Sequence, residues 1–121
     1  MVGCPSPFAA RTLQATRRNL DSWCLDTLIA DSPVLHLNFN QTMDETDKPG
    51  IGDFEGVDSD GTPVIVGQIA WDSSAVLRVH LTITFESTLD TFDFLGPLPS
   101  LKTLTGVIED GFELTSFEEC V

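Results

Sequence analysis

The stretch from residue 34 to residue 81 constrains the fold of this chain more than any other. Apolar and polar residues alternate along its first segment, VLHLNFN, and again along the segment VLRVHLTITF that begins at residue 76. A period of two is typical of a β-strand that buries one face and exposes the other. The expected core faces carry Leu35, Leu37 and Phe39 in the first segment and Leu77, Val79, Leu81, Ile83 and Phe85 in the second.

A turn signal lies between these two segments. Residues 58–61 read Asp-Ser-Asp-Gly and are flanked by apolar runs at 54–57 and 62–66. Glycine tolerates a positive φ, so Asp-Gly between apolar runs indicates a β-hairpin. We therefore expect these two runs to pair, with a bulge or bend at Gly67 and the strand continuing to Trp71.

The rest of the chain also reads as short strands. Residues 22–29 alternate well, residues 92–95 and 105–108 are shorter candidates, and the segment FELTSF near the end is expected to close a sheet. Residues 11–20 fit a helix or a strand, and we favour a strand because everything after them is β. Residues 96–103, GPLPSLKT, are predicted to be a proline-rich loop. The sequence predicts an all-β, antiparallel Ig-like β-sandwich of about seven strands with an N-terminal arm.

Charge divides the 121 residues into two parts. Residues 1–20 contain Arg11, Arg17 and Arg18 and no acid, whereas residues 21–121 contain all 19 acids and three bases, a charge of −16. We predict a basic arm over 1–20 and one sandwich domain over 21–121. The acidic body opposes binding to nucleic acid and to anionic membranes.

The basic segment has two candidate docking sites. It can pair with the acidic body of its own chain, or with the body of another copy. The sequence leaves both open, and Arg11, Arg17 and Arg18 are the candidate partner-binding residues in either case.

The three cysteines, Cys4, Cys24 and Cys120, are an odd number, which argues against a complete disulfide framework. The N-terminus lacks the basic and then apolar pattern of a signal peptide. We therefore expect reduced, partly buried thiols in a protein made in a cytoplasm. A later disulfide between Cys24 and Cys120 would tie an early strand to the C-terminus, if the geometry allows it. The spacing of the cysteines gives no tetrahedral metal set.

Chemical motifs are weak throughout the chain. The acidic loops, with Asp44, Glu45, Asp47, Asp53, Asp58 and Asp60, suggest a Ca²⁺ site, but they lack the EF-hand spacing, and turns and solubility explain them more simply. His36 and His80 are expected on outward strand faces, and no serine lies in a nucleophile elbow. No catalytic residue, metal or cofactor is expected. Trp23 and Trp71 could stack on sugars, but alternation places them in or near the core.

The passage from VLHLNFNQTMD to WDSSAVLRVHL resembles bacterial Ig-like domains, which occur as repeats in surface proteins and as accessory domains on tailed-phage virions. The similarity includes the acidic turn LNFNQTMDE, the strand start Asp53-Phe54, the DGTPV hairpin at 60–64 and the LRVHL strand. It covers about 50 residues and carries no catalytic residue over. The chain holds a single copy of the domain and no visible secretion signal, and its C-terminal third departs from the family pattern.

The resemblance, together with these departures, implies a non-enzymatic virion structural protein of a tailed phage. It would be a capsid decoration, head or tail subunit, assembled in the host cytoplasm as a homo-oligomer or lattice through contacts with copies of itself or other virion proteins. The alternative is a surface Ig-like binding module for carbohydrate or protein, stabilised by Ca²⁺ in one version.

Overall fold

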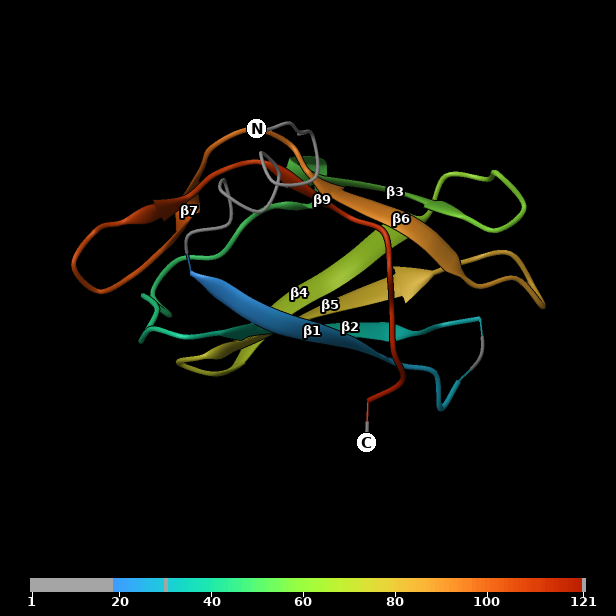
Figure 1. Cartoon of the computed structure of the whole chain (residues 1–121), viewed down its shortest axis with the longest axis horizontal. Helices are drawn as coiled ribbons and strands as arrows, with labels where there is room; N and C mark the ends of the chain where they lie inside the picture. The colour runs from blue at the N-terminus through green and yellow to red at the C-terminus, as the bar shows by residue number, and fades with distance from the viewer. Residues whose placement is uncertain (1–18, 30, 121) are drawn as a thin grey trace, which may run out of the picture.

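The computed structural model describes residues 19–29 and 31–120, and these residues are almost entirely β (Figure 1). The segment 11–20 falls outside the described residues except for its last two. The strands are β1 (Leu20–Asp26), β2 (Val34–Phe39), β3 (Phe54–Asp58), β4 (Ile65–Ser73), β5 (Val76–Thr82), β6 (Leu89–Phe94), β7 (Leu98–Lys102), β8 (Ile108–Glu109) and β9 (Phe112–Leu114). One 3-10 turn, η1 (Ile51–Asp53), precedes β3.

The strands form antiparallel sheets in two layers, which confirms the predicted all-β class (Figure 1). A four-stranded sheet has the order β1-β2-β5-β4, and a three-stranded sheet facing it has the order β3-β6-β9. A small hairpin, β7-β8, extends from one end of the sandwich. No helix among the described residues is long and apolar enough to cross a membrane.

The core lies between the two layers, where the predicted strand faces meet. Leu35, Leu37, Leu77 and Val79 have no exposed surface, as alternation predicted. The three-stranded sheet contributes an aromatic cluster of Phe54, Phe92 and Phe94, with ring centroids 4.9–6.2 Å apart. A side chain at Gly56 would meet Phe92 at 2.9 Å, so the strand needs glycine there to pack against the ring.

The predicted hairpin at 58–61 forms, but its strand pairing is short: Asp58 N donates to Thr62 O at 3.0 Å and Val64 N donates to Gly56 O at 2.8 Å. Gly61 has the expected positive φ of 82°, and a single bridge joins Val57 to Pro63. Beyond that bridge the chain crosses to the other layer, because β3 pairs with β6 and β4 pairs with β5. The turn is therefore a corner between sheets. The irregularity predicted at Gly67 is confirmed, since the register shifts between Val66 and Ile69.

Three other predictions are corrected. The proline-rich segment 96–103 contains β7; Pro97 directly precedes this strand and Pro99 lies within it, in a short hairpin where few ladder bonds are needed. The strand expected over 76–85 ends at Thr82, and Phe85 is 75% exposed instead of buried. The strand expected over 22–29 begins at Leu20 and ends at Asp26, so the last residue assigned to the arm belongs to the sheet.

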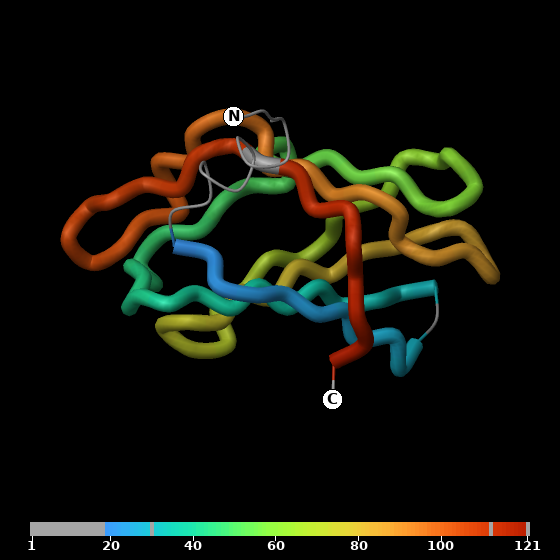
Figure 2. The backbone as a smooth tube through the Cα atoms, viewed as in Figure 1, coloured from blue at the N-terminus to red at the C-terminus, as the bar shows by residue number. Residues whose placement is uncertain are grey.

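The C-terminal segment leaves β9 and crosses to the other layer, where it lies beside β1 (Figure 2). Leu25 N donates to Glu118 O at 2.8 Å and Cys120 N donates to Leu25 O at 3.1 Å. A disulfide joins Cys24 to Cys120. The expectation of reduced thiols is therefore wrong for Cys24 and Cys120. The disulfide between them, which the sequence left open, is formed. Cys4 lies outside the described residues.

Candidate functional site

A row of three carboxylates crosses the outer face of the three-stranded sheet. Glu55 on β3 pairs in register with Asp93 on β6, and Asp93 pairs with Glu113 on β9. Neighbouring strands are about 4.8 Å apart, so the register places like charges side by side. Glu55 and Glu113 are exposed, and Asp93 between them is half-buried. We call these three residues the acidic row.

The acidic row is electrostatically strained at its centre. Burial raises the pKa of Asp93, and the charges of Glu113 and Glu55 and a side-chain hydrogen bond with Glu113 raise it further. One oxygen of Asp93, Oδ1, is buried without a hydrogen-bond partner. A cation that approached this face would relieve the repulsion and would favour the ionised form of Asp93.

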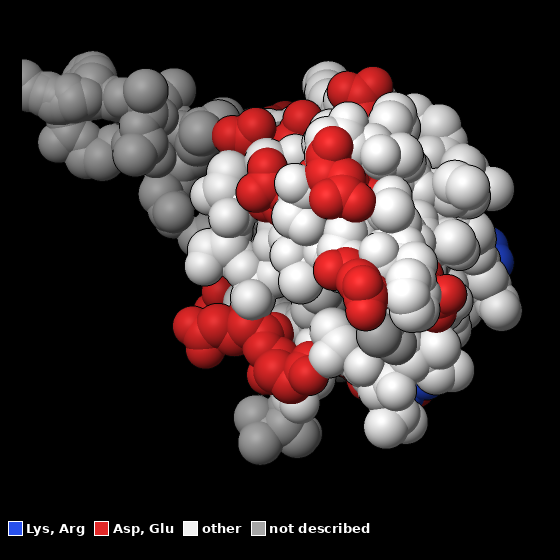
Figure 3. Space-filling view, turned by 90° about the vertical axis from the view of Figure 1, so that its right-hand side faces the viewer, with Lys and Arg blue, Asp and Glu red and all other residues white. Residues whose placement is uncertain are grey.

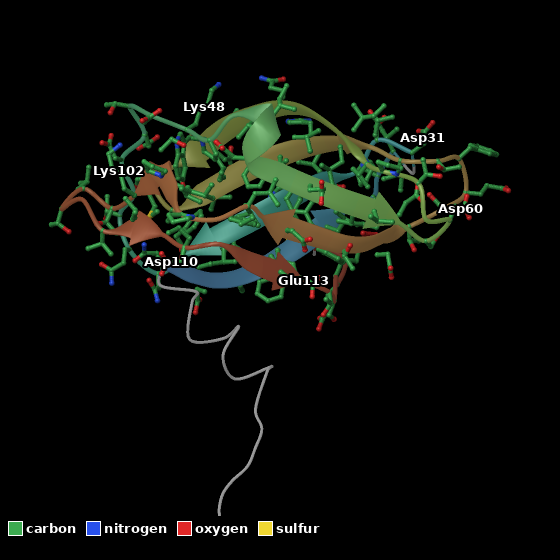
Figure 4. The ribbon with its side chains drawn as sticks, turned by 90° about the horizontal axis from the view of Figure 1, so that it is seen from above. Asp31, Lys48, Asp60, Lys102, Asp110 and Glu113 are labelled. Carbon is green, nitrogen blue, oxygen red and sulfur yellow. A yellow bond between two sulfur atoms is a disulfide. The ribbon has the colours of Figure 1, made fainter. Side chains whose placement is uncertain are left out.

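The described basic residues do not neutralise the acidic row. Arg78 on the opposite sheet pairs with Asp72 at 3.4 Å, and Lys102 lies 3.5 Å from Asp47 and 3.7 Å from Asp44. Figure 4 shows Lys48 and Lys102 at one end of the sandwich, away from Glu113 on β9. Among the described residues, therefore, no lysine or arginine forms an ion pair with the acidic row.

The end of the sandwich opposite Lys48 and Lys102 is also acidic, like the outer face that carries the acidic row. It carries the β1–β2, β3–β4 and β5–β6 connections, and Figure 4 places Asp31 and Asp60 there. Acidic side chains are spread over this end in Figure 3, and Lys and Arg are visible only at the margin. Three large apolar side chains are also exposed in its loops, namely Leu28, Ile29 and Phe85.

The predicted partner-binding residues Arg11, Arg17 and Arg18 lie outside the described residues. The row itself was missed from the sequence, because Glu55, Asp93 and Glu113 are far apart along the chain and only the strand register brings them together. The only sequence signal for the row was that each of the three strands carries an acid at a position facing outward.

Both tryptophans pack against the edge of the core, as alternation predicted. Trp71 Nε1 donates to Asp47 O at 2.7 Å, and Trp23 Nε1 donates to Ser116 O at 2.6 Å. Trp71 also forms one wall of an open hollow of about 550 Å³, whose other lining residues are Glu45, Thr46, Asp47, Lys48 and Ala70. The indole of Trp71 is half-buried and its N–H is already used, so a ligand in this hollow would meet mainly the polar groups of the lining.

Three of the acids that were weighed as Ca²⁺ ligands, Asp44, Asp53 and Asp58, make hydrogen bonds within the loops. Asp58 is 1% exposed, and its carboxylate accepts hydrogen bonds from the backbone N–H groups of Asp60, Thr62 and Thr84. Asp44 accepts from Thr46 N, and Asp53 accepts from Gly50 N. These bonds are the turn interactions expected of aspartate in loops.

A second polar group lies on the outer face of the four-stranded sheet. Cys24 on β1 pairs in register with His36 on β2, and Cys120 lies along the other side of β1. The ligand atoms of these three residues lie within 4.8 Å of one another. The sequence prediction that the cysteines give no metal set considered only their spacing to one another and did not weigh a histidine on a neighbouring strand.

No family model matches this chain, and a search of curated proteins also finds no match. The resemblance to bacterial Ig-like domains thus rests on the sequence motifs described above.

Proposed function

We propose that this protein is a non-enzymatic structural protein of a tailed-phage virion, a capsid decoration, head or tail subunit. It binds copies of itself or other virion proteins through its basic N-terminal segment and its acidic row. The observation that carries the proposal is the row itself, three carboxylates in register with no described base beside them. The chain's own Arg11, Arg17 and Arg18 have the complementary charge.

The order of the strands supports the Ig-like part of the proposal. A constant-type immunoglobulin sandwich has sheets ABED and CFG. The orders β1-β2-β5-β4 and β3-β6-β9 correspond to these letter by letter, if the β7-β8 hairpin is an insertion between F and G. The disulfide differs from the antibody pattern, since it joins β1 to the C-terminal segment instead of joining strands B and F.

The disulfide supports a working place outside the reducing cytoplasm. Disulfides persist in secreted proteins and on virion and cell surfaces, and are rare where thiols are kept reduced. A virion protein assembled in a host cytoplasm reaches oxidising surroundings on release. The Cys24–Cys120 disulfide is consistent with assembly in the cytoplasm followed by oxidation after release.

The energetics favour an array over an isolated pair. An exposed ion pair is worth about 0.2–1 kcal/mol, so three arginines on three carboxylates give a weak contact. The ion pair between an arginine and Asp93 would be somewhat stronger than the other two, because the partly buried carboxylate of Asp93 is less screened by salt. Many such contacts in a lattice act together through effective concentration, which lets weak single contacts hold an assembly.

The test is self-association of the full-length chain measured by light scattering at low and high salt. The variant E55Q/D93N/E113Q should lose association, and R11A/R17A/R18A should lose it equally. The matched control D31N/D60N/E86Q removes three charges from the far end of the sandwich and should associate as the unchanged protein does. Assembly is ruled out as the function if the unchanged chain stays monomeric at all concentrations and does not co-purify with particles.

The hollow beside Trp71 favours a second candidate, a surface binding module for carbohydrate or protein. Its polar lining, its open mouth and its place among the loops at one end suit a small polar ligand. Glycan-array binding that is lost in E45Q/T46A, two exposed positions of the lining, would support this function. A melting temperature that is the same with Ca²⁺ and with EDTA would count against its Ca²⁺-stabilised version.

A further inference from the structure

We propose that Cys24, Cys120 and His36 form a metal site for a thiophilic divalent cation such as Zn²⁺ when the disulfide is reduced. The same two sulfur atoms would then have two states, a disulfide in the oxidised protein and a metal-bound pair of thiolates in the reduced one. This proposal does not depend on the assembly function proposed above.

Ligand chemistry is the first support. Two thiolates and one imidazole are a zinc donor set, with Zn–S of about 2.3 Å and Zn–N of about 2.0–2.1 Å. In a tetrahedral site these bonds place the ligand atoms roughly 3.5–3.8 Å from one another. The three ligand atoms lie within 4.8 Å of one another in the disulfide form, and after reduction the two sulfur atoms have to move apart from bonding distance to reach the tetrahedral spacing.

The backbone supplies the second support, because it holds the three residues together without the disulfide. Ladder pairing fixes Cys24 opposite His36. Cys120 is held beside β1 by its own N–H on Leu25 O and by the bond from Leu25 N to Glu118 O. The side chain of Glu119 also accepts hydrogen bonds from the backbone and hydroxyl of Thr27. Reduction therefore frees the sulfur atoms without freeing the segment that carries Cys120.

Access is the third support. All three side chains are half-buried on the outer face of the sheet, where an ion can enter from solvent. Arg78, the register neighbour of His36 on β5, pairs with Asp72, which offsets part of its charge. Three protein ligands leave a fourth position for water or another small ligand.

The chemical steps balance as follows. A thiol or phosphine reductant supplies two electrons, the S–S bond breaks, and each sulfur atom takes up one proton. On metal binding each thiol releases that proton, and the two thiolates and the neutral imidazole donate lone pairs to the cation. Reoxidation needs a two-electron oxidant such as a small-molecule disulfide. It takes up the two electrons of the thiolates with two protons and leaves as two thiols, while the Cys24–Cys120 S–S bond re-forms and the metal ion is released.

The experiment uses the full-length chain with Cys4→Ser, so that the thiol outside the described residues does not contribute. The phosphine-reduced protein is titrated with Co²⁺, and absorption by thiolate-to-cobalt charge transfer is recorded, followed by displacement with Zn²⁺. The reduced protein should show this band, and the oxidised protein should not. H36N should weaken binding by at least 10–100-fold, the loss that removal of even an outer-shell partner causes.

H80N is the matched control, because His80 is a half-buried histidine on β5 of the same sheet and is not part of the group. It should bind the metal as the parent does. Zn²⁺ should also raise the melting temperature of the reduced parent, since a ligand of the folded state stabilises it. The proposal is overturned if the reduced parent gives no charge-transfer band, if H36N and H80N bind equally, or if Zn²⁺ leaves the reduced melting temperature unchanged.

Discussion

Asp58 shows how one side chain can organise a corner between two sheets. Its carboxylate accepts backbone N–H bonds from Asp60 and Thr62 in the turn and from Thr84 after β5. Burial opposes ionisation, but the hydrogen bonds from Thr84, Thr62 and Asp60 outweigh it and lower the pKa of Asp58 to about 2. The ionised form is therefore the one that holds the corner.

A carboxyl whose pKa is lower in the folded state stabilises the fold above its unfolded pKa of about 3.9. We expect this stability to be lost as the pH falls from about 5 to about 2. D58N should lower the melting temperature at neutral pH and flatten its dependence over that acidic range. Thermal melts at a series of pH values check this, and an unchanged acid limb in D58N would contradict it.

Phe85 shows what residue alternation cannot predict. Its position continues the buried face of Leu81 and Ile83, yet the strand ends at Thr82 and Phe85 is exposed. The next residue, Glu86, has a positive φ of 65°, in a turn closed by a bond from Ser87 N to Thr84 O. Sequence periodicity carries no information about such a turn, which is set by the contact of this loop with Asp58.

At the level of elements, the two-residue strand β8 is held by a buried acid. Glu109 has no exposed surface, and its Oε1 accepts from the N–H groups of Asn19 and Leu20 at 3.0 and 3.1 Å. Glu109 thus fastens the β7-β8 hairpin to the start of β1. In the sequence nothing distinguishes Glu109 from the other acids, of which the chain has 19 in all.

E109A should be strongly destabilising, because it leaves two buried donors unpaired at about 1–3 kcal/mol each. E109Q keeps an acceptor oxygen and should cost less. The exposed Glu45 is the control, and E45A should change the free energy of unfolding by no more than about 0.5 kcal/mol. Urea denaturation measures all three, and equal losses in E109A and E45A would refute the role of Glu109.

Strand existence was more predictable than strand partnership. Alternation located β2, β5 and their buried faces, because each buries one side against the other sheet. The pairing of β3 with β6 instead of β4 was not predictable, since a Asp-Gly turn fits a hairpin and a corner equally well. The acidic row was missed for the same reason, because its three residues become neighbours only through the pairing of three strands.

On the scale of the whole molecule, the disulfide closes a loop with a sequence separation of 96 residues. Cross-linking a loop of this length removes unfolded-state entropy worth about 4–5 kcal/mol in the chain-entropy description. Reduction should therefore lower the free energy of unfolding by up to that amount. C24S/C120S should match the reduced protein in metal-free buffer, and denaturation with and without a phosphine checks both. A reduced protein as stable as the oxidised one would contradict this.

The charge asymmetry of the chain could be read from the sequence, but its spatial form could not. Composition indicates an acidic body and a basic segment. Which acids meet, and which are already used by turns, depends on long-range packing. Asp58 and Asp93 look alike in the sequence, yet hydrogen bonds lower the pKa of one, and burial and neighbouring charges raise the pKa of the other.

The lock between β1 and the C-terminal segment also has a mechanical consequence. Tension applied to the chain before Cys24 and after Cys120 passes directly through the S–S bond, so the loop between them carries no load. That loop represents roughly 300 Å of extended chain that a stretching force cannot reach. Reduction would convert the sandwich from an inextensible link into one that can unravel under force.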